Sequence, residues 1–223
     1  MKKLVTIFFL LIAAFAFAEK PKRKVICVID TGIRASPELE NKLCGPVADM
    51  TGRGIEDKDG HGTNVASIIA RQIDGSRFCI VPVKWYHNMA TQVPIYLAIN
   101  KAVRMGANYI NISAGGDNPI DKERNALKRA LDKGIVITVA AGNDNQDLNE
   151  KCSYFPSCYS EFRSYNNWHV VANFRDGSYQ DGSNYNGPVN SLANGHKVSA
   201  GGSMMSGTSQ ASAQYMGQLV GAQ

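Results

Sequence analysis

Two periodicities of apolar residues alternate along the chain. Four short, mainly apolar runs have the length and the β-branched content of buried strands: residues 25–29, 78–83, 109–112 and 135–139. Between them, apolar residues recur at helical spacing, as in residues 95–103, and glycine follows at position 106. This alternation predicts an α/β fold of three layers, in which a mainly parallel sheet is flanked by helices on both faces.

Local signals refine this prediction at three places. Pro82 lies inside the second apolar run and predicts an edge strand or a strand end. A further helix is expected to bury Ile120 and Leu127 and to end before Gly134. Residues 176–194 are rich in Gly, Asn and Ser and predict loops and hairpins.

The first eighteen residues have the layout of a secretory signal peptide. Lys2 and Lys3 precede an uncharged apolar run, and this run ends in the small-x-small sequence of residues 16–18. We therefore expect a signal peptide over residues 1–18 and one globular domain over residues 19–223. The alternative is a retained anchor, but the run is shorter than the roughly 20 residues that a spanning helix needs. No stable membrane association is expected after cleavage.

Charge argues against nucleic acid as a partner. The formal net charge of +5 falls to +3 when the two lysines of the expected signal peptide are removed, and the remaining charges are scattered.

Five cysteines lie in the part of the chain that would be exported, where disulfides are plausible. Cys152 and Cys158 bracket a short loop and form the first candidate pair. Cys44 and Cys79 form the second, and Cys27 lies in an apolar run as a free thiol. The cysteine spacing does not suggest a zinc site, and we expect no metal and no cofactor.

Polar motifs occur where the predicted strands end and the helices begin. Asp30 ends the first strand, His61 opens a helix, and Ser209 opens the last helix. In an open parallel sheet, reactive groups gather at the carboxyl ends of the strands. A serine hydroxyl needs an imidazole to take its proton and a third group to orient that imidazole. These three residues therefore predict a catalytic triad.

A fourth motif places Asn143 after the strand of residues 135–139. Its amide could donate a hydrogen bond to the oxyanion of a tetrahedral intermediate. The backbone N–H of Ser209, at a helix N-terminus, could do the same.

Together these motifs resemble the subtilisin family of serine peptidases. Asp30-Thr31-Gly32, His61-Gly62-Thr63, Ala140-Ala141-Gly142-Asn143 and Gly207-Thr208-Ser209-Gln210-Ala211 follow one another in the family's order. The resemblance runs from about Lys24 to the end of the chain. It implies that Asp30 orients the imidazole, that His61 is general base and then acid, and that Ser209 is the nucleophile. It also implies an oxyanion hole made by Asn143 and Ser209.

The resemblance further implies how substrate binds. Ser113, Ala114 and Gly115 match the family's substrate-binding strand, whose backbone pairs with an extended peptide. Ala141 and Gly142 suggest a second pocket wall of small residues. Three aromatic residues are expected to pack within their own loop, with a subsite wall as the alternative: Tyr154, Phe155 and Tyr159. The remaining histidines, at positions 87, 169 and 196, are expected to be structural or exposed.

The function implied is that of a secreted or periplasmic serine endopeptidase, a monomer that acts on polypeptide substrates through an acyl-enzyme. Departures from the family pattern leave open a catalytically silent peptide-binding module as an alternative, and the shared acyl chemistry leaves open an esterase. Only residues 19–23 separate the expected cleavage site from the first strand, where relatives carry a sizeable pro-segment. Ala213 replaces a usual proline, and Asn64 replaces a usual histidine. An aspartic peptidase is not expected, because the chain has one Asp-Thr-Gly and such enzymes need two.

Overall fold

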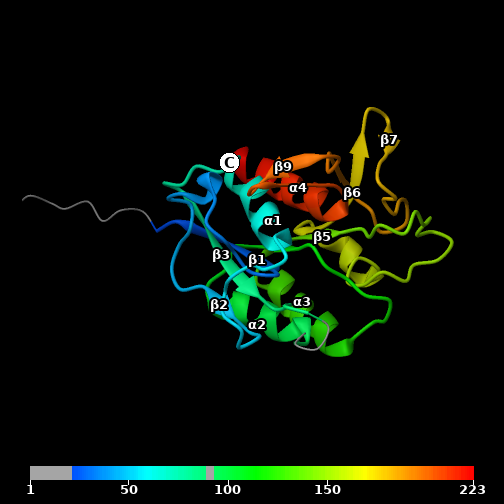
Figure 1. The fold of residues 1–223 in the computed structure, drawn as a ribbon. Helices are drawn as coiled ribbons and strands as arrows, with labels where there is room; N and C mark the ends of the chain where they lie inside the picture. Colours follow the sequence, from blue (N-terminus) through cyan, green and yellow to red (C-terminus); the bar gives the residue numbers. More distant parts are fainter. Residues whose placement is uncertain (1–21, 89–92) are drawn as a thin grey trace, which may run out of the picture.

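A computed structural model describes residues 22–88 and 93–223 of the protein (Figure 1). The expected signal peptide over residues 1–18 lies outside the described residues.

Eight strands form the main sheet, in the order β2-β3-β1-β4-β5-β6-β7, with β8 paired to β6. All of these pairings are parallel except the one between β6 and β7. The strands are β1 (Lys24–Asp30), β2 (Ala48–Asp49), β3 (Phe78–Lys84), β4 (Tyr109–Ile112), β5 (Val136–Ala140), β6 (Trp168–Arg175), β7 (Ser178–Tyr179) and β8 (Ser191–Ala193). A separate antiparallel hairpin consists of β9 (Val198–Ala200) and β10 (Ser203–Met205).

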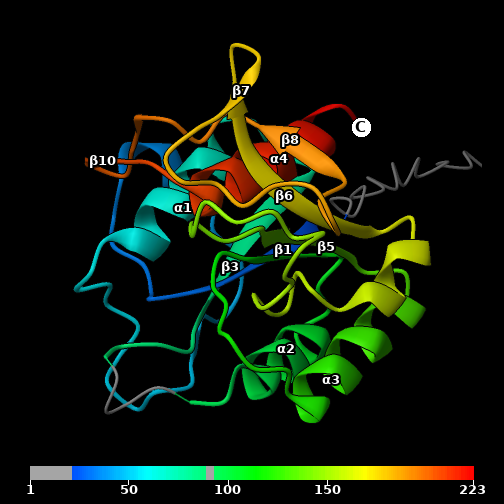
Figure 2. The same cartoon turned by 90° about the vertical axis from the view of Figure 1, so that its right-hand side faces the viewer.

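Helices cover both faces of this sheet (Figures 1 and 2). One face carries α1 (His61–Ala70) and α4 (Thr208–Gly221), and the other carries α2 (Ile95–Arg104) and α3 (Asp121–Asp132). Two short 3₁₀ helices lie in the connections, η1 (Pro37–Leu39) and η3 (Ser160–Ser164). The predicted three-layer α/β class is confirmed.

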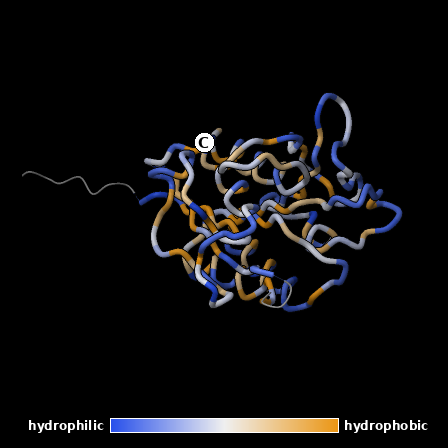
Figure 3. Tube along the Cα trace, viewed as in Figure 1, coloured by the Kyte–Doolittle hydropathy of each residue, from blue (hydrophilic) through white to orange (hydrophobic). Residues whose placement is uncertain are grey.

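The apolar core has two halves, one on each side of the sheet. Cys27 and Ile29 of β1 pack with the residues of α2 and α3, while Ile26 and Val28 pack with those of α1 and α4. A strand whose side chains alternate between two buried faces must be apolar at every position, which explains the continuous run in β1. Figure 3 shows the same distribution, with hydrophobic segments inside and hydrophilic segments in the outer loops.

The edge position predicted from Pro82 is wrong, because β3 lies between β2 and β1. The proline is tolerated because its nitrogen, which has no hydrogen to donate, faces the side of β3 where no strand residue is paired with position 82. Ile80 donates its N–H to Lys42 on the outer side of β3, and the period of two places the nitrogen of Pro82 on that same side. The two residues of β2 pair only with Val83 and Lys84, so no ladder bond is lost at position 82.

Ile120 was expected on the buried face of a helix, but it precedes α3 as its N-cap residue and is 46% exposed. The buried face of α3 consists of residues that follow it: Glu123, Ala126, Leu127, Ala130 and Leu131. The helical spacing was correct, and the error lies in the position of the first turn.

Both expected cysteine pairs are joined in the structure, Cys44 to Cys79 and Cys152 to Cys158. Cys27 is a buried free thiol, and burial raises its pKa to about 12. Within residues 22–88 and 93–223, none of the helices is both long and apolar enough to cross a membrane.

Candidate active site

Residues from five separate parts of the chain meet at the carboxyl edge of the sheet. Asp30 ends β1, residues 113–115 follow β4, and residues 141–143 follow β5. His61 is the first residue of α1, and Ser209 is the second residue of α4. A groove of about 570 Å³ runs along this edge, lined among others by Asp30, His61, Ser113, Gly115 and Tyr154.

Asp30 and His61 form a hydrogen-bonded pair. The distance from Nδ1 of His61 to Oδ1 of Asp30 is 2.8 Å, and the backbone N–H of Thr31 donates to the same oxygen at 2.8 Å. The charge of the Asp30 carboxylate raises the pKa of His61 to about 9, against the opposing effect of burial. An imidazole held in this way has a fixed orientation, and its Nε2 can accept a proton once the ring is neutral, as pH rises through about 9.

Asp57 holds the loop that leads into His61, a role that sequence reasoning missed. This carboxylate is fully buried and accepts hydrogen bonds from the Thr31 hydroxyl, from the Gly60 N–H, and from both the N–H and the hydroxyl of Thr63. Burial alone would raise the pKa of Asp57, but these hydrogen bonds outweigh it and the pKa is lowered. Asp57 therefore fastens the start of α1 to the end of β1. The available sequence signal was an acidic residue in the turn before a helix.

Gly62 allows the end of β1 and the start of α1 to approach each other closely. A Cβ atom at this position would lie 2.6 Å from the carbonyl oxygen of Gly32 and 3.1 Å from Cβ of Asp30. Any side chain here would push His61 away from Asp30, so glycine is required by contact.

Ser209 is nearly buried, and its hydroxyl donates to the carbonyl oxygen of Ser113 at 3.2 Å. Within the described residues, no hydrogen bond joins this hydroxyl to the ring of His61. The structure thus joins two members of the predicted triad and holds the third on a neighbouring backbone acceptor. Hydrogen bonds of this kind are often long or unformed without substrate.

A buried polar network fixes the backbone around Ser209. The Ser113 hydroxyl donates to the carbonyl oxygen of Ser209 at 3.1 Å and accepts from the Asn111 amide at 2.9 Å. The carbonyl of that amide accepts from the hydroxyls of Thr138 and Ser212, both at 2.9 Å. The network ties the first turn of α4 to β4 and β5, so Ser209 is positioned by the sheet itself.

The side-chain orientation of Asn143 is set by Thr208. Its Oδ1 accepts from the Thr208 N–H at 2.9 Å and from the Thr208 hydroxyl at 3.0 Å. A backbone N–H can only donate, so this contact assigns the oxygen and turns the Nδ2 group away from the helix. Asn143 is exposed, and this contact leaves its Nδ2 group available as a donor.

Asn184 holds the loop of residues 141–146 by hydrogen bonds, and this role was not identified from the sequence. It is fully buried, and its carbonyl accepts the N–H groups of Asp144 and Gln146, both at 3.0 Å. Its amide group donates to the carbonyl oxygen of Ala141 at 3.0 Å. Residues 141–146 are thus held by one side chain that reaches them from a loop far along the chain.

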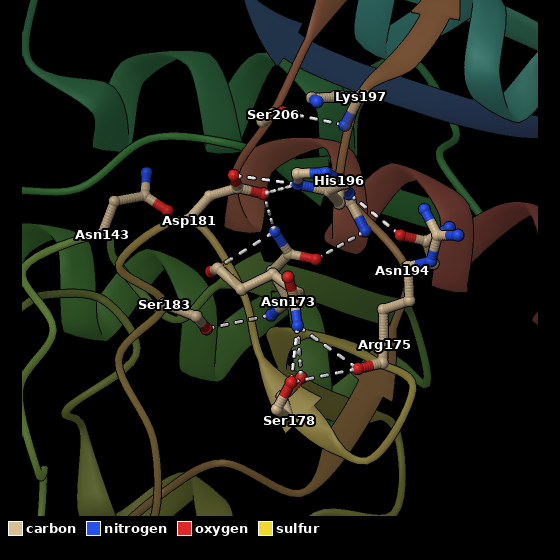
Figure 4. Close-up of polar contacts among 12 residues, drawn as sticks. Asn143, Asn173, Arg175, Ser178, Asp181, Ser183, Asn194, His196, Lys197 and Ser206 are labelled. Atoms are coloured by element: carbon tan, nitrogen blue, oxygen red, sulfur yellow. Dashed lines mark hydrogen bonds and ion pairs between the residues drawn. The ribbon is translucent and has the colours of Figure 1, made fainter.

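A second His–Asp pair lies beside the loop of Asn143 and has a structural role. Nδ1 of His196 lies 2.9 Å from Oδ2 of Asp181, and the same oxygen accepts from the Asn173 amide (Figure 4). The carbonyl of Asn173 accepts the N–H of Gly195 at 2.7 Å. In Figure 4, the hydroxyl of Ser206 is engaged by the N–H of Lys197. The pair therefore joins two loops, in agreement with the structural role expected for His196.

The other two histidines lie at different depths. The ring of His169 packs against Tyr215 with 5.1 Å between centroids, and burial lowers its pKa. His87 is partly buried.

Asn64, which replaces the histidine usual in relatives, is a buried cross-link. Its amide donates to the carbonyl oxygens of Ala200 and Ser203, and its own carbonyl accepts from Gln210. It thus connects α1 to the β9–β10 hairpin and to α4. Among the residues that the structure describes, no group of three or more His, Cys, Asp and Glu side chains is arranged to hold a metal ion.

An Asp–His pair and a serine at a helix start are the groups of a serine hydrolase. On a parallel α/β sheet, the chain order Asp, His, Ser is that of the subtilisin type. The chain belongs to the subtilase family, whose family model matches residues 22–221. The resemblance identified from the motifs is therefore confirmed.

Two relatives illustrate this membership. The major intracellular serine protease of Bacillus subtilis (strain 168) is 34% identical over 160 residues, which are 64% of this chain and 50% of the relative. Alkaline protease 1 of Emericella nidulans is 28% identical over 207 residues, which are 85% of this chain and 49% of the relative. The chain spans about half the length of these two relatives.

Solved structures show the same fold. A cold adapted subtilisin-like serine proteinase superposes with a TM-score of 0.70 at 23% identity, over 86% of this chain and 72% of that chain. The prenylagaramide maturation protease PagA gives a TM-score of 0.66 at 23% identity, over 87% of this chain and 72% of that one.

Proposed function

We propose that the protein is a serine endopeptidase that hydrolyses peptide bonds through Asp30, His61 and Ser209. The observation that carries this proposal is the 2.8 Å hydrogen bond between Asp30 and His61, at the sheet edge where Ser209 begins α4. A silent peptide-binding module would have no need of an oriented imidazole.

The proposed reaction begins at Ser209. Ser209 Oγ attacks the carbonyl carbon of the scissile bond while His61 Nε2 accepts the hydroxyl proton, and Asp30 stabilises the imidazolium that forms. The oxyanion accepts hydrogen bonds from the amide of Asn143 and from the backbone N–H of Ser209. His61 then donates its proton to the leaving amine, and the acyl group stays on Ser209. A water molecule, deprotonated by His61, hydrolyses this acyl-enzyme.

Substrate binding and activation are coupled at Ser113 in this proposal. An extended peptide that pairs with Ser113, Ala114 and Gly115 presents a backbone N–H to the Ser113 carbonyl oxygen. This is the acceptor that holds the Ser209 hydroxyl in the unbound structure. The incoming N–H would displace the hydroxyl, and a rotation about the Cα–Cβ bond of Ser209 would turn it toward His61.

We also propose that the protein is exported and works as a monomer on polypeptide substrates. Support comes from the signal-peptide pattern of residues 1–18 and from two disulfides in the remaining chain. Disulfides persist in oxidising compartments, such as the periplasm and the extracellular space.

The experiment is covalent labelling with a fluorophosphonate, followed by mass spectrometry of the labelled peptide. The probe should modify Ser209 in the wild-type protein, while Ser209→Ala should melt at a similar temperature and take up no label. Ser206→Ala is the matched control, an exposed serine three residues earlier, and should label like the wild type. A folded wild type without label, or an equally labelled Ser209→Ala, would refute the proposal. Cleavage of a short-chain ester but of no peptide would indicate the esterase alternative.

A further inference from the structure

The ring of Tyr154 fills the space between two glycines, Gly115 in the segment after β4 and Gly142 in the segment after β5. A Cβ atom on Gly115 would lie 2.4 Å from Cζ and 2.5 Å from Cε1 of this ring. A Cβ atom on Gly142 would lie 2.8 Å from its Cγ and 3.0 Å from its Cδ1. The ring therefore bridges the two segments with its base against residue 142 and its hydroxyl end against residue 115.

The backbone that carries this ring is fixed to the wall beside it. Gly116 and Phe155 form an antiparallel bridge with two hydrogen bonds, of 2.9 and 2.8 Å. The carbonyl oxygen of Tyr154 accepts the N–H of Cys158 at 3.0 Å and the hydroxyl of Ser157 at 2.6 Å. Since the disulfide between Cys152 and Cys158 closes the same loop, the ring cannot leave its place without breaking several of these contacts.

The Tyr154 side chain is part of the lining of the groove and is not a mobile surface side chain. Tyr154 is half-buried, and one part of it lines the groove that also contains His61 and Ser113. Burial, together with the carboxylates of Asp144 and Asp117, raises the pKa of Tyr154 to about 12, so the ring stays neutral.

This space is where the first substrate side chain on the acyl side has to lie. The attacked carbonyl carbon must be in contact with Ser209 Oγ, with its oxygen toward the amide of Asn143. The side chain of the substrate residue that supplies this carbonyl branches from the Cα atom bonded to the carbonyl carbon. With the peptide backbone paired along residues 113–115, it points between this segment and residues 141–143. The occupant of that space therefore sets the preference for this residue.

We propose that Tyr154 closes this subsite, so that the peptidase cleaves after glycine or alanine and excludes larger side chains. The inference rests on the proposed function, because it concerns the residue whose carbonyl Ser209 attacks. A methyl group can lie over the face or edge of the ring, whereas a leucine or phenylalanine side chain would need the volume that the ring already fills.

The experiment uses internally quenched peptides that differ only in this residue, which is Gly, Ala, Leu or Phe, with the cleaved bond verified by mass spectrometry. For the wild type we expect kcat/KM to be about 10²-fold higher for Ala than for Phe, the range that steric differences in a pocket produce. In Tyr154→Ala, cleavage after Leu and Phe should rise by a similar factor. Tyr154→Phe, which keeps the ring, should keep the discrimination between Ala and Phe. Tyr179→Ala, on the distant β7 hairpin, should behave as the wild type.

Fluorophosphonate labelling of every variant separates the possible outcomes. Labelled wild type that cleaves equally well after Ala and Phe overturns the closed subsite and leaves the proposed function intact. Labelled Tyr154→Ala that still rejects Phe also overturns it. If Tyr154→Ala does not fold, Tyr154→Val provides the same test with a smaller loss of packing. Wild type that takes up no label removes both proposals together.

Discussion

Replacing Asp30 with asparagine tests the central pair of the site with a change of one charge. The charge of Asp30 is the largest cause that raises the pKa of His61 from 6.5 to about 9. A shift of that size corresponds to about 3 kcal/mol in favour of the imidazolium. Asparagine keeps the size of the side chain but removes its charge, and it can present an amide N–H₂ to Nδ1 in place of a carboxylate acceptor. Burial still lowers the pKa of His61 and the charges of Asp59 and Asp57 still raise it, so we expect the pKa to fall back toward 6.5 in Asp30→Asn.

The sign of the effect on activity follows from the proton that His61 must accept. In the wild type, the general base is free only as pH rises through about 9, so activity should increase toward alkaline pH. In Asp30→Asn the inflection should move to lower pH, while the maximal rate falls by about 10⁴ because the imidazole loses its preferred tautomer.

Stability should respond as well. A raised histidine pKa contributes stability that is fully present below 6.5 and is lost as pH rises through 9. The variant should lack this contribution.

Two independent measurements test the predicted effects of Asp30→Asn on the pKa of His61 and on the activation of Ser209. An NMR titration of the imidazole signals follows the pKa of His61 directly, and His196, which is paired with Asp181, is the internal reference. The rate of fluorophosphonate labelling against pH reports the base that activates Ser209. A His61 pKa that stays near 9 in Asp30→Asn would refute the assignment of Asp30 as the main cause. An unchanged maximal rate would refute its catalytic role.

Two further changes test the oxyanion donor and the charge of a buried acid. Asn143→Ala should lower kcat by about 10²–10³ with little change in KM, because the lost donor acts mainly in the transition state. Steady-state kinetics on one peptide checks this prediction. A rise in KM with an unchanged kcat would contradict it. Burial raises the pKa of Glu123 from 4.5 to about 7, against a weaker opposing hydrogen bond from Tyr159, so its ionisation above pH 7 costs stability. Glu123→Gln should therefore raise the free energy of unfolding by up to about 3 kcal/mol at pH 8 and have little effect at pH 4. Urea unfolding at both pH values measures it, with the exposed Glu150→Gln as control, and equal effects at both would exclude this cause.

The parts of the fold that the sequence revealed are those governed by local pattern. The apolar run of β1 and the helical spacing of α2 each depend on burial of neighbouring positions, and both elements lie within a residue or two of their predicted bounds. Asp30 and His61 were recognisable because each stands where an element ends or begins. The supporting residues were not. Asp57 and Asn184 act through hydrogen bonds to N–H groups that only the folded chain brings to them. Periodicity contains no information on such partners.

The small residues of the groove illustrate why a site can be located from sequence while its specificity cannot. Gly115 and Gly142 were interpreted as walls of a pocket, and a wall without side chains suggests room for a large substrate residue. In the structure, the same missing side chains admit the ring of Tyr154, which takes up that room. What decides between the two outcomes is the bridge between Gly116 and Phe155, a pairing of segments distant in sequence. Two chains with identical wall motifs can therefore accept different substrates, because the loop that packs between the walls determines the volume left for the substrate side chain.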